Sequence, residues 1–281
     1  MKKVLVVLVA ALFLAACGGT NSGEKFDLGL NLTKGEVYKQ KMVSEMDMKQ
    51  TLMGQEMNIK MNIKADMSYN VKDFKDDQYE VEVKYDKMSM AFDAGQGNQE
   101  FGSALESQNN RLNDVMKSMT DKSFTMLLTK SGKVTEVRDL DNIFEDLFTS
   151  LGEDMSPEQV AQMKAQLEES YGEDALTGNI EQSFSFLPDH PVAVGDEWDV
   201  SSKLSGRFPA EVKGKYVLKE MKDDSYVISN VSTISMNADE PIVQNGMEMK
   251  MNLEGTMEGD MNIDRNTGWI ISSTINQDFG G

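Results

Sequence analysis

The chain has 281 residues, a formal net charge of −19 and one cysteine. A surface this acidic repels phosphate backbones and anionic headgroups, which argues against a protein that binds nucleic acid. A single cysteine cannot form an intramolecular disulfide, so the fold must be held by its core.

The chain begins with MKKVLVVLVAALFLAA, which has the pattern of a cleavable export signal. Lys2 and Lys3 precede an apolar run, Val4 to Ala16, that is too short to span a bilayer comfortably. We therefore expect residues 1–16 to be a signal peptide. Removal of the two lysines would change the formal charge from −19 to −21.

The end of this run, Leu14-Ala15-Ala16-Cys17, resembles the lipobox of bacterial lipoproteins. The resemblance implies cleavage before Cys17, acylation of Cys17 by chains such as palmitate, and a lipid anchor in the cell envelope. Several acyl chains exceed what stable anchoring requires. The alternative is a retained membrane helix with an incidental cysteine.

Residues 17–25 are expected to form the lipidated cysteine and a flexible linker, since GGTNSG at 18–23 is small and polar. In the lipoprotein family an aspartate after the cysteine resembles an inner-membrane retention signal. Gly18 occupies that position, so the resemblance favours the outer membrane, facing the periplasm.

Residues 26–93 show the period-two alternation of long β-strands. The segment 36–53 is long enough that we expect it to coil or bulge. In MNIKMNIKADMSYNV, Met57 and Met61 alternate with polar residues and so share one face. The KDD segment at 75–77 predicts a turn.

A helical pattern covers 101–119, and a hairpin is predicted around Ser131-Gly132. A block of helices follows from about 139 to 185, in which Ser156, Pro157 and Gln159 form the pattern of a capping box.

Strands and turns return from 186 to 281. The segments EGD, at 258–260, and DRNTG, at 264–268, are both expected to shape the end of the sheet.

The second β region resembles the first. MSYNVKDFKDDQYEVEVKYDKMSM at 67–90 is similar to GKYVLKEMKDDSYVISNVSTISM at 214–236, and both contain KDD. We therefore expect an α+β protein that is mainly antiparallel β. A duplicated β unit would form curved sheets or a half-barrel, with a helical insert between the copies. A single domain, 26–281, would contain repeats 26–138 and 186–281; the alternative is chance similarity between hairpins.

The lipobox, the LNLTKGE start, the central helices and PVAVGDEW at 191–198 together resemble an uncharacterised bacterial lipoprotein family, a domain of unknown function. The resemblance covers nearly the whole chain but implies no activity and no site residues. More loosely, long curved strands with a helical plug are similar to the periplasmic lipoprotein-carrier fold.

Methionine recurs at every second position in MEMKM, residues 247–251, as it does near 57–61. Thioethers are ligands for Cu(I), so a copper site is one interpretation. However, Met alternates freely with Ile and Leu in these strands, which indicates packing rather than ligation. A third interpretation is an apolar ligand wall formed by Met57, Met61, Met247, Met249 and Met251.

The sequence contains no catalytic motif with an interpretable geometry. His190, the only histidine, lies in LPDHPV and is expected to be a turn residue. Trp198 and Trp269 follow glycine-containing turns and are expected to anchor sheet ends rather than to stack on sugars. We expect no catalytic residues, no metal and no cofactor.

The sequence therefore predicts a non-enzymatic, membrane-anchored envelope lipoprotein. Its curved sheet would bind an apolar ligand or an envelope protein partner, and its membrane contact would be made by N-terminal acyl chains. The alternatives are a structural or interaction lipoprotein with a filled core, and then a Cu(I)-binding protein or a hydrolase.

Overall fold

The structure is a computed structural model. It describes residues 23–52, 55–95, 97–105, 111–120, 122–140, 156–171, 177, 180, 183–204, 210–237, 242–244, 247–249 and 252–280. The segment 1–22, which carries the expected signal peptide and Cys17, lies outside these ranges.

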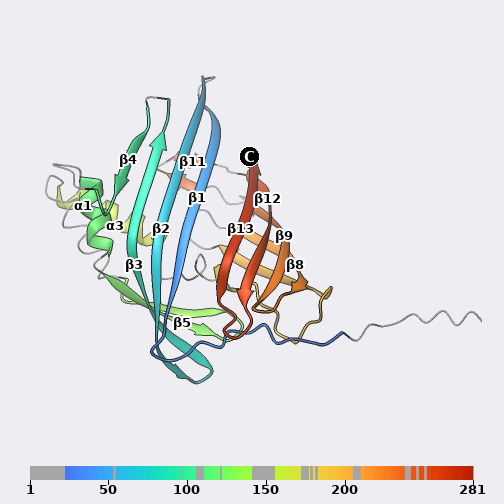
Figure 1. The fold of residues 1–281 in the computed structure, drawn as a ribbon. Helices are drawn as coiled ribbons and strands as arrows, with labels where there is room; N and C mark the ends of the chain where they lie inside the picture. The colour runs from blue at the N-terminus through green and yellow to red at the C-terminus, as the bar shows by residue number, and fades with distance from the viewer. Residues whose placement is uncertain are drawn as a thin grey trace, which may run out of the picture.

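Two open antiparallel sheets form most of the molecule (Figure 1). The first contains, in hydrogen-bonded order, β1 (Val37–Leu52), β2 (Gln55–Lys75), β3 (Gln78–Asp93), β5 (Ser123–Thr129) and β6 (Val134–Arg138), and β4 (Gln99–Gly102) pairs with β3. The second contains, in order, β7 (Glu197–Leu204), β8 (Ala210–Met221), β9 (Ser225–Asn237), β12 (Asn252–Asp264) and β13 (Ile270–Gly280). A separate ribbon pairs β10 (Ile242–Gln244) with β11 (Met247–Met249).

The mainly antiparallel β prediction is confirmed, and each sheet is an open meander rather than part of a closed barrel. The long strands β1–β3 rise well beyond the part of the sheet that β5 joins (Figure 1). Strand β1, which is expected to coil or bulge, pairs with β2 without a register shift. A bulge is found instead in β3, where the register against β2 shifts between Asp66 and Met67. Such a bulge increases the local twist of the sheet.

Two helices are described, α1 (Arg111–Thr120) and α3 (Pro157–Tyr171). At the start of α3, Gln159 Oε1 accepts the Ser156 amide at 2.8 Å and Ser156 Oγ accepts the Gln159 amide at 3.3 Å, which confirms the capping box. About half of the expected insert at about 139–185 lies outside the described residues. None of the described helices is long and apolar enough to cross a bilayer.

The hairpins β2–β3 and β8–β9 share one register. The opposed core residues are Val71 and Val81 in the first, Leu218 and Ile228 in the second. A one-residue bulge follows each pair, at Lys72 and at Lys219. The predicted KDD turn closes the first hairpin, with Asp76 and Asp77 at positive φ.

The segments that lead into β1 and β7 dock on these hairpins in the same way. The Gly35 amide donates to the Val71 carbonyl at 2.8 Å, and the Gly195 amide donates to the Leu218 carbonyl at 2.8 Å. Both glycines have positive φ, 87° and 95°, which a glycine adopts without steric cost. The same backbone contact therefore begins both meanders.

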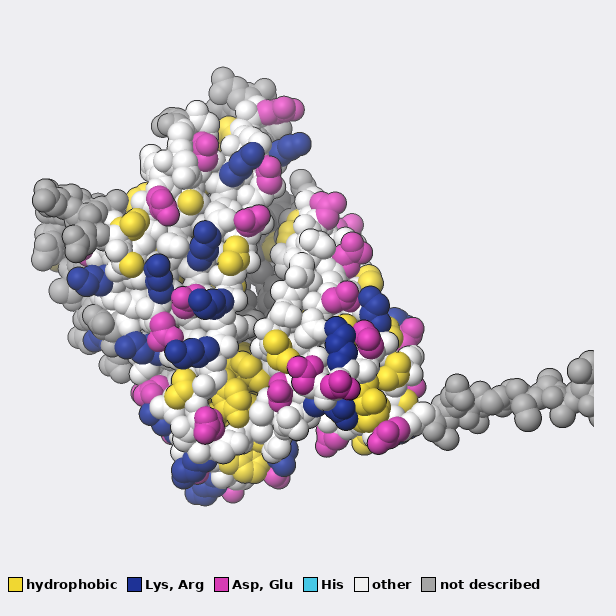
Figure 2. Space-filling model, in the orientation of Figure 1, with side chains coloured by type: hydrophobic (Ala, Val, Ile, Leu, Met, Phe, Trp, Pro, Cys, Tyr) yellow, Lys and Arg dark blue, Asp and Glu magenta, His cyan; other side chains and the backbone are white. Residues whose placement is uncertain are grey.

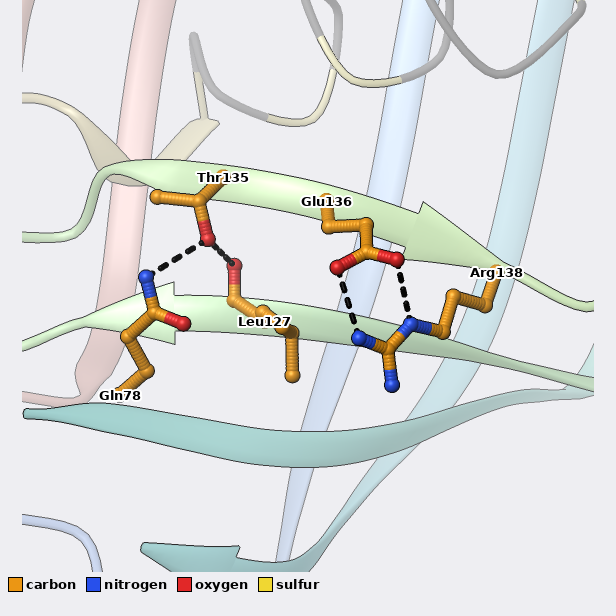
Figure 3. A network of polar contacts seen from close by, with 5 residues as sticks. All are labelled: Gln78, Leu127, Thr135, Glu136 and Arg138. Atoms are coloured by element: carbon orange, nitrogen blue, oxygen red, sulfur yellow. Dashed lines mark hydrogen bonds and ion pairs between the residues drawn. The ribbon is translucent and has the colours of Figure 1, made fainter. Parts of the chain in front are cut away.

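The hairpin β5–β6 also carries a bulge, which places Thr135 beside a short polar network (Figure 3). Gln78 Nε2 donates to Thr135 Oγ1 at 3.0 Å, while Arg138 donates two hydrogen bonds to the Glu136 carboxylate. The bonds from Arg138 lower the pKa of Glu136. Since both charged side chains are largely exposed, this network adds little to stability.

The main core lies where the foot of the first sheet meets the second sheet. Its largest fully buried side chains are Leu28, Met126, Leu128, Leu218, Ile228 and Ile263. A smaller cluster, Ala210, Val212, Ile234, Met236 and Met257, lies further along the second sheet. The indole rings of Trp198 and Trp269 are buried, as expected of anchors.

The N-terminal segment 26–33 connects the two sheets. The Leu30 amide donates to the Lys130 carbonyl in the β5–β6 turn at 2.7 Å, and the Asn31 amide donates to the Thr267 carbonyl in the β12–β13 turn at 2.9 Å. Phe26 pairs with Val192 through two backbone hydrogen bonds.

The expectation for EGD at 258–260 is wrong, whereas DRNTG does form the β12–β13 turn. Gly259 lies in the middle of β12, opposite Ile275 of β13. A Cβ at this position would collide with the Thr274 carbonyl oxygen. The glycine therefore permits a close approach between strands instead of a turn.

Gly132 provides a test of the packing between β5–β6 and the segment that contains Phe184. Its φ is +84°, and a Cβ would collide with the Phe184 carbonyl oxygen. Gly195→Ala is the matched control, because Gly195 has φ +95° and an open surrounding. We expect Gly195→Ala to lower the free energy of unfolding by about 1–2 kcal/mol. Gly132→Ala should cost about 1–3 kcal/mol more, measured by denaturant titration of tryptophan fluorescence. Equal losses of unfolding free energy in the two variants would show that the atoms around Gly132 move and relieve the collision.

Candidate functional site

The candidate site is the upper inner face of the first sheet. Here "inner" denotes the face that carries the buried Tyr69 and Val71 at its foot. We call this surface the methionine face; its residues are Met42, Met46, Met48, Ile59, Met61, Ile63, Met88, Met90 and Phe92.

Strand register brings these residues onto one face, since directly opposed residues in a sheet point to the same side. Met46 lies opposite Met61, and Met61 lies opposite Phe92. The neighbouring row joins Ile63 to Met90, and Met90 to Phe101 of β4. Each row mixes methionine with other apolar residues, as expected of a surface that requires bulk and adaptable shape.

The face is continuous with the core but more exposed. Met126 and Val71, at its foot, have exposed fractions of 0%. Met42, Met46 and Met48, on β1, have exposed fractions of 44%, 40% and 45%. A large group of apolar side chains left accessible to solvent indicates a surface that binds something.

Strand β13 of the second sheet carries exposed apolar side chains on its inner face. Ile275 and Phe279 lie on the same side as the buried Met257 and are 45% and 43% exposed. The molecule is hollowed between the lobe of β1–β2 and the lobe of β12–β13 (Figure 2). Strands β1 and β13, each an edge strand of its sheet among the described residues, stand on either side of this hollow (Figure 1).

An aromatic cluster lies where the two sheets meet at the foot of the methionine face. The Trp269 ring lies 5.1 Å from the Tyr38 ring and 5.0 Å from the Tyr69 ring, measured between centroids. The buried indole Nε1 of Trp269 has no hydrogen-bond acceptor among the described residues. A buried donor without a partner costs about 1–3 kcal/mol.

Tyr69 adds a polar contact to the same cluster. Its hydroxyl donates to Gln40 Oε1 at 2.8 Å, and burial, together with nearby Tyr85, raises its pKa far above the ordinary value for tyrosine. The phenol is therefore neutral and can act only as a hydrogen-bonding group. The foot of the methionine face thus combines aromatic surface with uncharged polar atoms.

The sequence-predicted ligand wall is only partly placed by the structure. Met57 and Met61 lie on β2, with Met57 at 37% exposed and Met61 half-buried. Met247 and Met249 belong to β11, but their side chains, and Met251 altogether, lie outside what the structure describes. Sequence reasoning does not assign the β1 methionines or Phe92 to the wall, although the alternation in 42–48 contains the information.

Side chains that could bind a metal ion do not converge in the described part of the chain. His190 is exposed and contacts only the neighbouring Asp189, at 2.7 Å, which suits a turn residue. The hydrogen bond with His190 lowers the pKa of Asp189. Among the described residues, no three histidine, cysteine or carboxylate side chains are grouped so that they could hold a metal ion.

Residues 76–270 match a protein family of unknown function, DUF6263, and the chain belongs to this family. The match runs from the β2–β3 turn to the first residue of β13, so it includes parts of both sheets. No curated protein and no solved structure matches the chain.

The methionine face predicts a contrast between two truncations of the same residue type. Met126→Ala should lower the free energy of unfolding by about 2–5 kcal/mol, because this side chain is buried. Met46→Ala should cost less than about 1 kcal/mol, because much of its side chain already contacts solvent. Urea titrations of both variants measure the difference. A loss at Met46 equal to that at Met126 would mean that the face is part of the closed core.

Proposed function

We propose that this member of the DUF6263 family is a non-enzymatic lipoprotein of the bacterial cell envelope that binds an apolar ligand on the methionine face. The observation that carries the proposal is the continuation of the core into a half-exposed apolar surface. Met46 and Met48 represent that surface on β1.

The size and composition of the surface favour an elongated apolar ligand. Apolar side chains extend from β1 across β2 to β3, and Ile275 and Phe279 of β13 offer a second wall. Methionine is unbranched and adapts to irregular shapes, so a surface rich in it suits a flexible ligand.

The proposed location depends on the sequence Leu14-Ala15-Ala16-Cys17 and its resemblance to a lipobox. An acylated Cys17 would hold the domain at the outer membrane, on the periplasmic side, through the linker 17–25. The anchor would be separate from the binding face, because the first described β contact begins only at Phe26. An apolar ligand exchanged with a membrane would then have a short distance to travel.

We also propose that the two meanders descend from one duplicated β unit. The equal registers of β2–β3 and β8–β9, with bulges at Lys72 and Lys219, support this origin. The matching contacts of Gly35 and Gly195 support it further. The longer strands of the first copy would then be the specialised part that carries the methionine face.

The proposed lipid anchor predicts that Cys17→Ala yields a folded protein that is no longer attached to the membrane. Without an acyl chain the protein should leave the membrane fraction, while the β-sheet circular dichroism spectrum should not change. Ser22→Ala in the linker is the control and should stay in the membrane fraction. Retention of Cys17→Ala in that fraction after a carbonate wash would contradict acylation at this residue.

Native mass spectrometry of the full chain, extracted from its own envelope, tests the proposed ligand binding. We expect an additional small-molecule mass on the parent protein. The double variant Met46→Gln, Met48→Gln should retain about tenfold less of this small molecule, since two half-exposed side chains together contribute about 1.4 kcal/mol to the binding free energy. The control is Val43→Gln, which lies on the opposite face of the same strand.

The control should bind as the parent does. Equal occupancy in all three proteins would contradict the methionine face as the binding site. An additional mass with the size of a polypeptide would favour a protein partner instead of a small apolar ligand.

A further inference from the structure

Lysines gather on the outer face of the first sheet, opposite the methionine face. Strand register places them in three adjacent rows across β1, β2 and β3. We call these residues the lysine band; they are Lys39, Lys41, Lys64, Lys84 and Lys87. All five are exposed, and dark blue side chains mark this side of the molecule over β1–β3 (Figure 2).

The lysine band is only weakly neutralised by its surroundings. Its carboxylates are Asp66, within the second row, and Asp86, which accepts a hydrogen bond from Ser68 at 3.1 Å. Among the described residues, only Lys41 of the band has a carboxylate within ion-pair distance, Asp66 at 3.9 Å. Five lysines and two aspartates leave three positive charges on this surface, in a chain whose total is −19.

The neighbouring rows differ, because their carboxylates equal or outnumber their lysines. Lys72 contacts Glu82 at 2.8 Å, below the lysine band. The row directly above the band contains Glu45 and no lysine, and in the next row Lys60 lies between Asp47 and Asp93. The excess positive charge is thus confined to the lower middle of the outer face.

Two further features distinguish the lysine band from a solvated sheet face. Val37 and Val43, on the same face of β1, are exposed at 49% and 61%. A depression of about 630 Å³, lined by residues that include Lys39, Lys41, Asp66 and Ser68, lies beside them. Basic side chains that are interleaved with small apolar ones suit the boundary between headgroups and water.

We propose that the lysine band docks the domain onto anionic lipid headgroups of the membrane that holds its anchor. This inference rests on the proposed lipid anchor, because three net positive charges are too few to hold a free protein of charge −19 at a membrane. For a tethered domain this weak attraction is sufficient, because the lipid anchor makes docking an intramolecular event at a high effective concentration.

Acidic side chains of the second sheet face the same side of the molecule as the lysine band, so docking on the band requires the second sheet to tilt away from the headgroups (Figure 2). Acidic side chains of β12, such as Glu254, Glu258 and Asp260, lie on the second sheet, and magenta side chains are frequent over β12–β13 (Figure 2). An anionic surface attracts the lysine band and repels the second sheet. The described chain enters beside the second sheet, where Phe26 pairs with Val192, and then runs along the foot of the molecule to the start of β1 (Figure 1).

Docking by this face leaves the methionine face turned away from the headgroups. The two faces lie on opposite sides of β1–β3 because side chains alternate along a strand. Val43 and Lys64 point to one side, and their neighbours Met42 and Ile63 point to the other. The lysine band thus determines which side of the sheet remains open to a ligand or to a second protein.

The test is an acetylation footprint of the lipidated full chain reconstituted in vesicles. One preparation contains phosphatidylcholine alone, and the other contains phosphatidylcholine with about 30% phosphatidylglycerol, which supplies the anionic headgroups. We expect each of the five lysines to be acetylated at least about threefold more slowly on the anionic vesicles. The protection should disappear in about 1 M salt, where the screening length falls to about 3 Å.

Lys203, on β7 of the second sheet, is the internal control and should react equally on both vesicles. The variant Lys39→Gln, Lys41→Gln, Lys84→Gln should lose the protection of Lys64 and Lys87. If the protein floats with the vesicles but its five lysines are acetylated equally fast on both kinds of vesicle, docking by the lysine band is contradicted while the lipid anchor is supported. A protein that does not float with either kind overturns the anchor, and the docking inference with it.

Discussion

The architecture depends on how one short segment, 26–33, holds two separate sheets together. In the described residues the sheets share no strand ladder, and each is an independent meander. Segment 26–33 donates backbone hydrogen bonds to the β5–β6 turn of one sheet and to the β12–β13 turn of the other. Its buried residues, Leu28, Leu30 and Leu32, fill the space between them, each contributing about 1.5–3 kcal/mol through burial. The hydroxyl of Tyr79 fixes this segment by accepting from the Leu32 amide and donating to the Leu30 carbonyl.

This arrangement packs the two sheets against each other at only one end of the molecule, and the position of the proposed site is a consequence of this. The core fills the junction at the foot, where β5, β6 and segment 26–33 lie against the second sheet. Strands β1–β3 extend beyond the junction, so the apolar face that they bury below continues into a half-exposed surface above (Figure 1). A sheet face with period-two alternation remains apolar along its whole length, whether or not something covers it. The methionine face is therefore the physical consequence of strands longer than the sheet that packs on them.

The sequence predicts what depends on neighbouring residues and misses what depends on distant ones. The KDD turn, the Ser131-Gly132 hairpin and the Ser156–Gln159 capping box are local patterns, and the structure confirms them. The prediction for Gly259 is wrong because a glycine between two acidic residues is typical of a turn, whereas its real neighbour is Thr274 on the next strand. The lysine band could not be predicted either. Its five members are scattered over 39–87, and the bulge between Asp66 and Met67 decides which of them face the same side.

Charge on the two sides of one sheet shows why composition alone is a poor guide to surface properties. The total of −19 predicts repulsion from every anionic surface, yet local potentials depend on the charges within about 8–10 Å of a point, because salt screens the rest. Within that distance Lys39 and Lys84 flank Ser68, which donates to Asp86, so the two lysines of this row outnumber its one carboxylate. The inner side of the same strands carries no such excess, since Gln40, Met67 and Tyr85 occupy the adjoining positions. The pleat therefore separates two chemistries on one set of strands, and β1, at the free edge, presents both of them to solvent.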